Sequence, residues 1–484
     1  MRKLPLALIL LVAVNACGLS AQPTAVPSTG GPPPSPAAPA TKAPVTLQAS
    51  PTATAAPALT ADVVVKLGEP EGVIRPLLGV NLGPLPQGDA GNADLTERYQ
   101  QFGVAQIRTH DYYGPLDMAT LYPDQNADPA DPASYDFEAS DRFFAAVLAG
   151  GFEPYLRLGD SYNATDGYPK AEPPAPTNPR NWVRAAVEVV RHYRDLAGGQ
   201  LRYVEIWNEP DNTQFWDGDR RAFFSLFTDA AIALKTEFPD LKIGGPGLTP
   251  AGALSPQGQA FTRGLLDAAQ VRNAPLDFFS WHMYSNDPEQ YRSAARFYRT
   301  ELDQHGYTAA ESHITEWNTA DRDQASGLSP ETVRLGGQGA AILSAAWIVL
   351  QDEGVAVSTL YRGPDPTLDL PTFYGLFFAD GRPKRSGLVF GLWAQLAAHP
   401  ERLPVTVDPG SGLWVIAGRN AADEVAVLMV NPTATTHVWR LADPAGQAVV
   451  YEVSDASEAV VELRPSGDAA AIGAYTTQLL VVGP

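Results

Sequence analysis

The chain has 484 residues, a formal net charge of −20 at pH 7 and a pI near 4.7. Its length is sufficient for two folded domains, and its 45 % of hydrophobic residues is ordinary for a soluble globular protein with a large core. An acidic chain without a basic patch repels nucleic acid, so we exclude nucleic-acid binding from the expected functions.

The N-terminal residues 1–17 have the pattern of a bacterial export signal. Two basic residues precede an apolar run over residues 4–14, which is shorter than the roughly 20 residues that a membrane-spanning helix needs. The run leads into Val14-Asn15-Ala16-Cys17, which resembles the lipobox of bacterial lipoproteins, and Cys17 is the chain's only cysteine. We therefore predict a lipoprotein-type signal peptide with Cys17 as the lipidated residue. An ordinary secreted protein is the alternative.

The segment over residues 18–60 has the composition of a linker. It contains ten prolines, many Ala and Thr residues and a single charged residue, Lys42. Such a segment buries too little apolar surface to fold by itself. We therefore predict a disordered Pro/Ala/Thr-rich tether between a membrane anchor and an extracytoplasmic globular part, at the cell surface or in the periplasm.

Short apolar strands alternate with amphipathic helical stretches over residues 75–400. The predicted strands lie at 79–84, 104–114, 153–160, 203–211, 241–248, 277–285, 313–319 and 357–365. Continuous apolar runs are typical of a parallel sheet buried on both faces, and this number of units predicts a (β/α)₈ TIM barrel. A doubly wound open sheet is the alternative, but the first strand is not followed by a Gly-rich phosphate loop.

The pattern changes after residue 400 to short strands separated by turn residues. These runs lie at 412–419, 423–431, 436–443, 448–454, 458–463 and 475–482. They predict a small antiparallel β-sandwich over residues 401–484 as an accessory domain. The apolar run within 61–74 precedes the barrel, and we predict that it adds a strand to this sandwich.

Two motifs place a glutamate beside tryptophan and asparagine at the end of a predicted strand. They are YVEIWNEPD at 203–211, which contains Glu209, and HITEWNT at 313–319, which contains Glu316. Functional side chains of a TIM barrel lie at the carboxyl ends of its strands, so the two carboxylates are expected to meet. Retaining glycoside hydrolysis requires such a pair, one as proton donor and the other as nucleophile.

These motifs resemble clan A of the glycoside hydrolases. Together with IRTHDYYG at 107–114 and FSWHMY at 279–284, they resemble family 39, the β-xylosidase and α-L-iduronidase family. The resemblance covers roughly residues 75–484. It implies that Glu209 is the general acid/base and Glu316 the nucleophile. It also implies that the substrate-binding or supporting residues are Asn208, Tyr284, Arg108, His110, His282 and Trp317.

The resemblance gives these supporting residues distinct expected roles. Asn208 is expected to bind the sugar 2-hydroxyl, and the two histidines are expected to contact other sugar hydroxyls. A nearby cation and a hydrogen-bond donor favour the charged form of a carboxylate, so Arg108 and Tyr284 are expected to keep Glu316 ionised. The negative charge of Glu316 is in turn expected to raise the pKa of Glu209.

The expected function is double displacement on a glycan or glycoside, with a β-xyloside as the family's default substrate. We expect no cofactor, and the chain has no metal-binding motif. Alternatives with the same chemistry are an arabinofuranosidase, an iduronidase-like enzyme or an endo-acting enzyme on bacterial or plant polysaccharide. A non-catalytic carbohydrate-binding surface lipoprotein is an alternative of another class. The sequence leaves the oligomeric state open.

Overall fold

The computed structural model describes residues 60–65, 68–86, 92–112, 114–162, 174–321, 326–441, 448–465 and 469–483. The predicted signal peptide with Cys17 and the predicted linker up to residue 59 lie outside these ranges, as does part of the loop after the third barrel strand. None of the helices in the described ranges combines the length and the apolar character that crossing a membrane requires.

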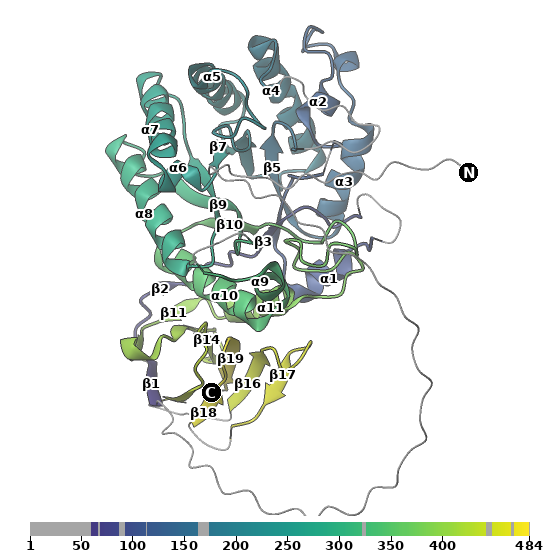
Figure 1. Ribbon diagram of the computed structural model, residues 1–484. Helices are drawn as coiled ribbons and strands as arrows, with labels where there is room; N and C mark the ends of the chain where they lie inside the picture. The colour runs from purple at the N-terminus through teal and green to yellow at the C-terminus, as the bar shows by residue number, and fades with distance from the viewer. Residues whose placement is uncertain are drawn as a thin grey trace, which may run out of the picture. The chain divides into compact units, whose positions relative to one another are not determined.

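Parallel strands close into a barrel in which each strand pairs with the next in chain order, and β10 returns to pair with β3 (Figure 1). Their bounds are β3 (Gly79–Asn81), β4 (Gln106–Arg108), β5 (Glu153–Leu158), β6 (Tyr203–Ile206), β7 (Lys242–Leu248), β8 (Phe278–Tyr284), β9 (Glu311–Asn318) and β10 (Val357–Leu360). The prediction of a TIM barrel is confirmed.

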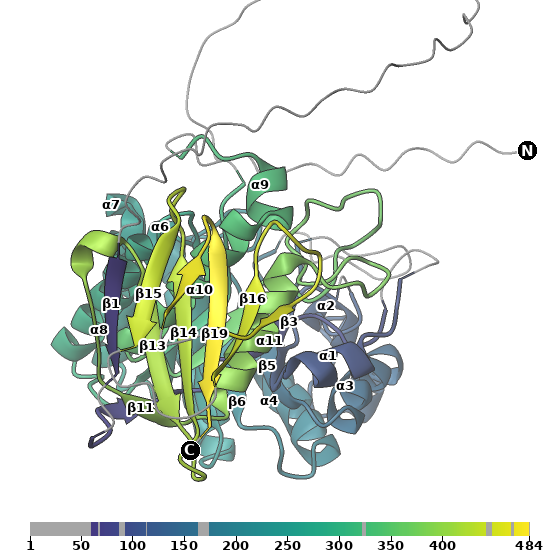
Figure 2. The ribbon, with the colours of Figure 1, turned by 90° about the horizontal axis from the view of Figure 1, so that it is seen from below.

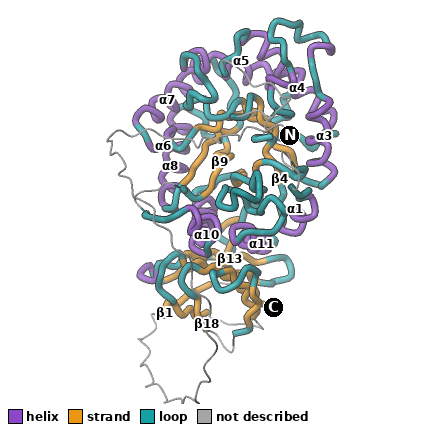
Figure 3. The backbone as a smooth tube through the Cα atoms, turned by 45° about the vertical axis from the view of Figure 1, so that its right-hand side comes forward, coloured by secondary structure: helices purple, strands orange, loops and turns teal. Residues whose placement is uncertain are grey.

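Helices surround the barrel strands (Figure 3). They are α1 (Thr96–Phe102), α2 (Met118–Leu121), α3 (Glu138–Ala149), α4 (Pro179–Leu196), α5 (Arg220–Glu237), α6 (Ala251–Leu254), α7 (Pro256–Val271), α8 (Pro288–Gln304), α9 (Pro330–Leu335), α10 (Gly337–Asp352) and α11 (Arg385–Ala397). In α4, for example, the Asn178 side chain caps the first turn and Pro179 takes the first helical position. Its buried residues recur at intervals of three and four, which gives the helix one apolar face toward the barrel.

Aromatic side chains fill the floor of the barrel at the opposite end from the expected site. Tyr155, Tyr203 and Phe278 form a separate buried cluster with Val357. The ring of His313 stacks on Phe278 at 4.3 Å, and its Nδ1 lies 2.9 Å from the Tyr155 hydroxyl. The barrel interior is therefore a packed core at this end, and only the carboxyl ends of the strands are available for a site.

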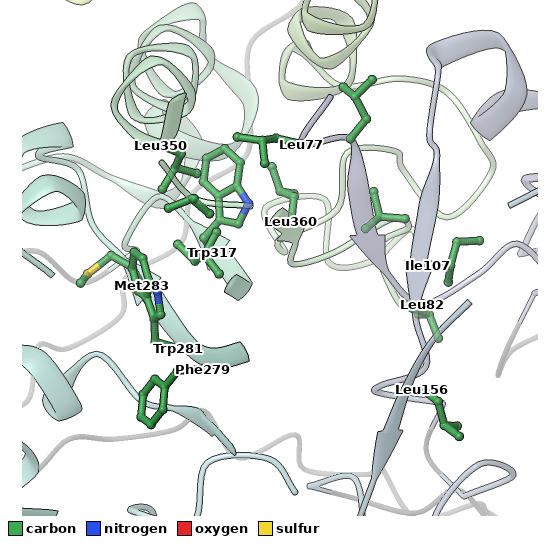
Figure 4. Close-up of a cluster of buried hydrophobic side chains, with 14 of the residues drawn as sticks. Leu77, Leu82, Ile107, Leu156, Phe279, Trp281, Met283, Trp317, Leu350 and Leu360 are labelled. Carbon is green, nitrogen blue, oxygen red and sulfur yellow. The ribbon is translucent and has the colours of Figure 1, made fainter. Parts of the chain in front are cut away.

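Tryptophans dominate the layer between the barrel and its last helices. Trp317 of β9 stacks on Trp393 of α11 at 5.9 Å, and Trp393 stacks on Trp347 of α10 at 5.7 Å. All three are fully buried. Figure 4 shows part of the same cluster, including Trp281, Trp317 and Leu360.

The C-terminal region forms two sheets that enclose a core of their own (Figure 2). One has the order β12 (Val405–Val407), β1 (Thr60–Val65), β15 (His437–Leu441), β18 (Ala469–Ile472). The other has the order β17 (Val461–Leu463), β16 (Ala448–Val453), β19 (Thr476–Val482), β14 (Val425–Asn431), β13 (Trp414–Arg419), β11 (Glu401–Leu403), β2 (Gly72–Val73). The N-terminal strands β1 and β2 thus belong to these sheets and not to the barrel.

The sandwich packs against α10 and α11. The backbone N–H of Gly337 donates to Asp455 Oδ1 at 2.7 Å, and Arg385 Nε donates to the carbonyl of Ser454 at 2.9 Å. Because α10 lies between the barrel and the sandwich, it is buried on nearly every side, which explains its lack of a polar face. The barrel's hydrophobic core therefore continues across α10 and α11 to Leu428 and Leu479 of the sandwich, and it is separate from the core between the two sheets.

We expect the substitution Trp393→Ala to lower the free energy of unfolding by about 3–5 kcal/mol, because it leaves a cavity between two stacked tryptophans. Urea unfolding followed by circular dichroism measures the change. Val271→Ala is the control, since Val271 is 81 % exposed and its truncation should cost less than about 0.5 kcal/mol. Equal losses in the two variants would contradict this account of the core.

Candidate active site

Glu209 lies just beyond β6 on a backbone that turns sharply. Trp207 has a φ of 80° and Glu209 a φ of 46°, in the left-handed region that non-glycine residues rarely adopt. The backbone N–H of Glu209 donates to the carbonyl of Gly247 at 2.9 Å, which holds this conformation. Such strain is typical of functional positions, where the surrounding fold forces a side chain into a fixed direction.

Glu316 reaches the barrel interior because of a bulge in β9. Trp281 of β8 pairs with Ile314, whereas the next residue, His282, pairs with Glu316, so Thr315 is the extra residue. The bulge breaks the alternation of the strand and re-aims the side chains that follow it. Glu316 therefore faces the site.

The bulge also places Trp317 on the outer face of β9, where it packs in the core and donates to Ser358 Oγ at 2.7 Å. The expectation that Trp317 belongs to the site is therefore wrong. The strand alternation after the bulge directs it away from the interior, toward Trp393 of α11.

Both carboxylate oxygens of Glu316 have donors. Oε1 lies 2.9 Å from Arg108 Nη1 and 3.2 Å from His110 Nε2, and Oε2 accepts from the Tyr284 hydroxyl at 2.8 Å. These three residues come from β4, from the residues just after β4, and from the end of β8. The fold thus brings three of the predicted supporting residues to Glu316.

Arg108 connects the nucleophile candidate to the rest of the site. It is fully buried and donates to Glu316, to Asn81 Oδ1 at 2.9 Å, to Glu205 Oε2 at 2.6 Å and to Asn208 Oδ1 at 2.7 Å. The bond to Asn208 fixes its amide so that Nδ2 has no partner among the described residues. A buried amide donor therefore remains for a ligand.

Glu209 has its own pair of neighbours. Its Oε1 lies 2.9 Å from Nδ1 of His282, and its Oε2 accepts from Asn212 Nδ2 at 3.2 Å. One ligand atom from each of Glu209, His282 and Glu316 lies within 4.8 Å of the others. These three groups could hold a metal ion by distance alone, but the guanidinium of Arg108 already supplies a positive charge at Glu316.

Burial gives the two carboxyl groups raised pKa values. Burial raises the pKa of Glu209 to about 7, while Asn212 and Arg108 oppose the rise. It also raises the pKa of Glu316 above its usual value, although His282, Arg108 and Tyr284 favour the ionised form. Burial is thus the largest cause at Glu209, and the two carboxylates also interact, because the charge of Glu209 raises the pKa of Glu316. Burial lowers the pKa of His282 to about 4, so this histidine is neutral.

Several residues of the site are not among those predicted from the sequence. Asn81 and Glu205 contact Arg108 from the barrel interior, and Asn212 contacts Glu209. Glu205 lies in the first motif, four residues before Glu209. Because the side chains of a strand alternate between its two faces, the position of Glu205 could have indicated a carboxylate directed into the barrel. Asn81 and Asn212 carry no comparable signal.

Aromatic side chains flank the carboxylates on two sides. Tyr284, Tyr361 and Tyr374 contact one another at centroid distances of 5.4–6.1 Å beside Glu316. On the other side, the ring of Phe215 lies 6.3 Å from the ring of His110. These half-buried rings offer apolar faces suited to the apolar faces of a sugar.

Comparison with known proteins gives three findings on this chain. Residues 81–307 match the family described as glycosyl hydrolases family 39. The β-xylosidase of Geobacillus stearothermophilus is 26 % identical over 249 residues, covering 46 % of this chain and 48 % of the relative. That of Caldicellulosiruptor saccharolyticus is 27 % identical over 242 residues, covering 46 % and 47 %. The chain thus spans about half the length of these curated relatives.

A solved structure extends the likeness to the C-terminal region. The crystal structure of a glucosidase from Croceicoccus marinus superposes with a TM-score of 0.70 at 24 % identity. It covers 88 % of this chain and 99 % of that chain, so the two share the whole arrangement of barrel and sandwich.

We expect Glu209→Gln to raise the free energy of unfolding by about 3–4 kcal/mol at pH 8, because the ionised carboxylate is disfavoured in the fold. The pKa of Glu209 rises from about 4.3 in the unfolded chain to about 7 in the fold. The wild type therefore loses stability relative to the variant as pH rises between these values, and the difference should vanish at pH 4.

Urea unfolding at pH 4, 6 and 8 measures this difference. The control is Glu301→Gln, which removes a buried carboxylate paired with Arg263 at 2.7 Å and should destabilise the fold at pH 8. A wild type more stable than Glu209→Gln at pH 8 would contradict the assignment of a raised pKa to Glu209.

Proposed function

Because the chain belongs to glycosyl hydrolase family 39, we propose that it is a retaining glycoside hydrolase. The observation that carries the proposal is the carboxylate pair, whose nearest oxygens lie within 4.8 Å. Retaining enzymes hold these groups about 5–5.5 Å apart, whereas inverting enzymes need about 6.5–9.5 Å to admit a water molecule. The distance therefore favours direct attack by a carboxylate over attack by water.

In the first step of the proposed reaction, Glu316 Oε attacks the anomeric carbon while Glu209 gives its proton to the glycosidic oxygen. The bond between the anomeric carbon and that oxygen breaks, and the aglycone leaves as an alcohol. In the second step, Glu209 takes a proton from water, whose oxygen attacks the anomeric carbon and releases Glu316 as a carboxylate. A pKa of about 7 lets Glu209 hold its proton in neutral solution and still act as a base.

Buried polar groups around the pair are placed to orient the sugar. Asn208 Nδ2 and His110 Nδ1 make no hydrogen bond to any described residue. Both side chains are almost completely buried, and each is fixed by its other polar atom, Asn208 by Arg108 and His110 by Glu316. Sugar hydroxyls would satisfy these atoms, since a buried polar group without a partner is costly.

The substrate that we propose is a β-xyloside, because both curated relatives carry the name β-xylosidase. Other sugars and endo-acting attack on a polysaccharide use the same carboxylates and remain outcomes of the substrate test. A binding protein without turnover is less well supported, because binding requires neither a proton donor with a pKa of about 7 nor an attacking carboxylate.

We also propose that the protein is exported and anchored to a membrane through Cys17. The support lies in the lipobox-like residues 14–17 and in the Pro-rich segment that follows them. The long segment over residues 18–60 would let the catalytic part reach substrates away from the lipid surface.

We expect Glu209→Ala to lower kcat/KM on aryl β-xylosides by about 10²–10⁴-fold and Glu316→Ala to abolish turnover. Azide should rescue the first variant with a product of retained configuration, because it attacks the glycosyl-enzyme from the face where Glu209 stood. Azide should rescue Glu316→Ala with a product of inverted configuration, because it attacks the anomeric carbon from the cavity left by the Glu316 side chain. Proton NMR of the glycosyl azides distinguishes the two anomers.

Glu301→Gln is the matched control for these variants and should retain wild-type activity, because it alters a buried carboxylate on α8 outside the site. A wild-type product that first appears with inverted configuration would overturn the retaining mechanism. Turnover only of another aryl glycoside or of a polysaccharide would keep the mechanism and replace β-xyloside as the substrate.

We expect the full chain, expressed in a bacterium, to incorporate an alkyne-tagged fatty acid and to partition into detergent. Cys17→Ala should do neither, because it removes the thiol that carries the lipid. Fluorescence of the clicked label on a gel and Triton X-114 phase separation measure the two properties. A wild type that is unlabelled and remains in the aqueous phase would contradict lipidation.

A further inference from the structure

A third carboxylate, Glu205, lies beneath the proposed catalytic pair. Its side chain is fully buried on the inner face of β6, and its Oε2 lies 2.6 Å from Arg108 Nε. Its other oxygen accepts from the Thr315 hydroxyl at 2.8 Å, at the bulge directly before Glu316. Glu205 is therefore held from both sides, by the cation that binds Glu316 and by the residue that re-aims it.

Glu205 and Glu316 share a single guanidinium. Nε of Arg108 donates a hydrogen bond to Glu205, and Nη1 donates one to Glu316. One buried positive charge therefore lies between two negative charges. Burial alone would raise the pKa of Glu205, but Arg108 and Ser280 lower it below its usual value, so Glu205 remains ionised. Arg108 thus has a permanent counter-ion that takes no part in bond formation.

The charge balance around Arg108 changes during the proposed reaction. When Glu316 forms an ester with the sugar, it loses its negative charge, and Arg108 loses one of its two anionic partners. An uncompensated buried cation is strongly unfavourable. With Glu205 present, the guanidinium stays paired in the glycosyl-enzyme, so the first step carries no such penalty.

We propose that Glu205 is a positioning residue that holds Arg108 and balances its charge while Glu316 is esterified. The inference rests on the proposed function, and it goes beyond the two reacting carboxylates. It assigns the glutamate of the Tyr203-Val204-Glu205-Ile206 strand a role in the first chemical step. Without its charge, Arg108 opposes the loss of negative charge from Glu316.

The test is Glu205→Gln, which keeps the size of the side chain and removes its charge. We expect kcat/KM on the aryl glycoside cleaved by the wild type to fall about 10²-fold. With a 2-deoxy-2-fluoro glycoside, inactivation should slow by a similar factor, whereas reactivation of the trapped enzyme should not slow. Reactivation restores the charge of Glu316, which an unbalanced Arg108 favours. Equal slowing of both steps would overturn the proposal in favour of a merely structural role.

The pH profile gives a second readout. The titratable or charged groups that face Glu316 are Arg108, His110, Glu209, His282 and Tyr284, and Glu205→Gln leaves all of them in place. Loss of the Glu205 charge strengthens the net positive field at Glu316, so the acid limb of kcat/KM should move to lower pH. An unmoved acid limb would overturn the charge-balancing role.

Two further variants separate charge from position. Glu205→Asp keeps the charge and should leave the acid limb where it is in the wild type, with part of the activity restored. Thr315→Val removes the hydroxyl that donates to Glu205. It should lower kcat/KM severalfold without shifting the acid limb of the pH profile. Wild-type kcat/KM in both would overturn the positioning role, even if Glu205→Gln failed to fold. Glu301→Gln again controls for loss of a buried carboxylate.

A measurement without substrate separates this inference from the proposed function. Carbon-13 NMR of labelled glutamate follows the titration of Glu316, which should move to lower pH in Glu205→Gln. A wild type that cleaves no glycoside would refute the proposed function, and the NMR titration would still decide the electrostatic role of Glu205.

Discussion

The buried guanidinium of Arg108 is the interaction on which the site depends. An isolated charge in a protein interior is costly, so a buried cation must be surrounded by acceptors. Here the acceptors come from β3, β6, the turn after β6 and β9, through Asn81, Glu205, Asn208 and Glu316. One side chain of β4 therefore fixes the mutual positions of three other segments that are far apart in the sequence: β3, β6 with the turn that follows it, and β9. The aromatic floor beneath them excludes water and keeps these bonds strong.

Local departures from regular strands aim the functional groups. A bulge at Thr315 turns Glu316 inward, and a second register shift lies between Pro246 and Leu248 in β7. That shift brings Gly247 next to His282, so close that a side chain at Gly247 would meet Nε2 of the ring at 2.9 Å. The carbonyl of Gly247 also fixes the strained backbone of Glu209. Regular strands would present these groups to different faces of the sheet.

The sequence was sufficient for the barrel, because apolar runs bounded by turns mark each strand and helical periodicity marks each helix. It was insufficient to predict β11, β12 and β18, because these strands are only three or four residues long. In addition, β18 is mostly alanine, a residue with little strand preference. In the site, Arg108, His110, Asn208, Tyr284 and His282 gather around the two glutamates as expected. Trp317 does not, because it directly follows the inward-facing Glu316, and strand alternation places it on the outer face of β9. The bulge that lets both Thr315 and Glu316 face inward is revealed only by the pairing of β9 with β8.

The source of the raised pKa of Glu209 matters for the proposed two-step reaction. If the charge of Glu316 were the main cause, esterification would lower the pKa sharply and convert Glu209 from an acid into a base. Burial is instead the dominant cause, and it persists when Glu316 is esterified. The contribution of burial therefore keeps the pKa of Glu209 above its usual value in both steps, and esterification removes only the contribution of the Glu316 charge. His282 lies 2.9 Å from Glu209, and burial lowers the pKa of this histidine to about 4.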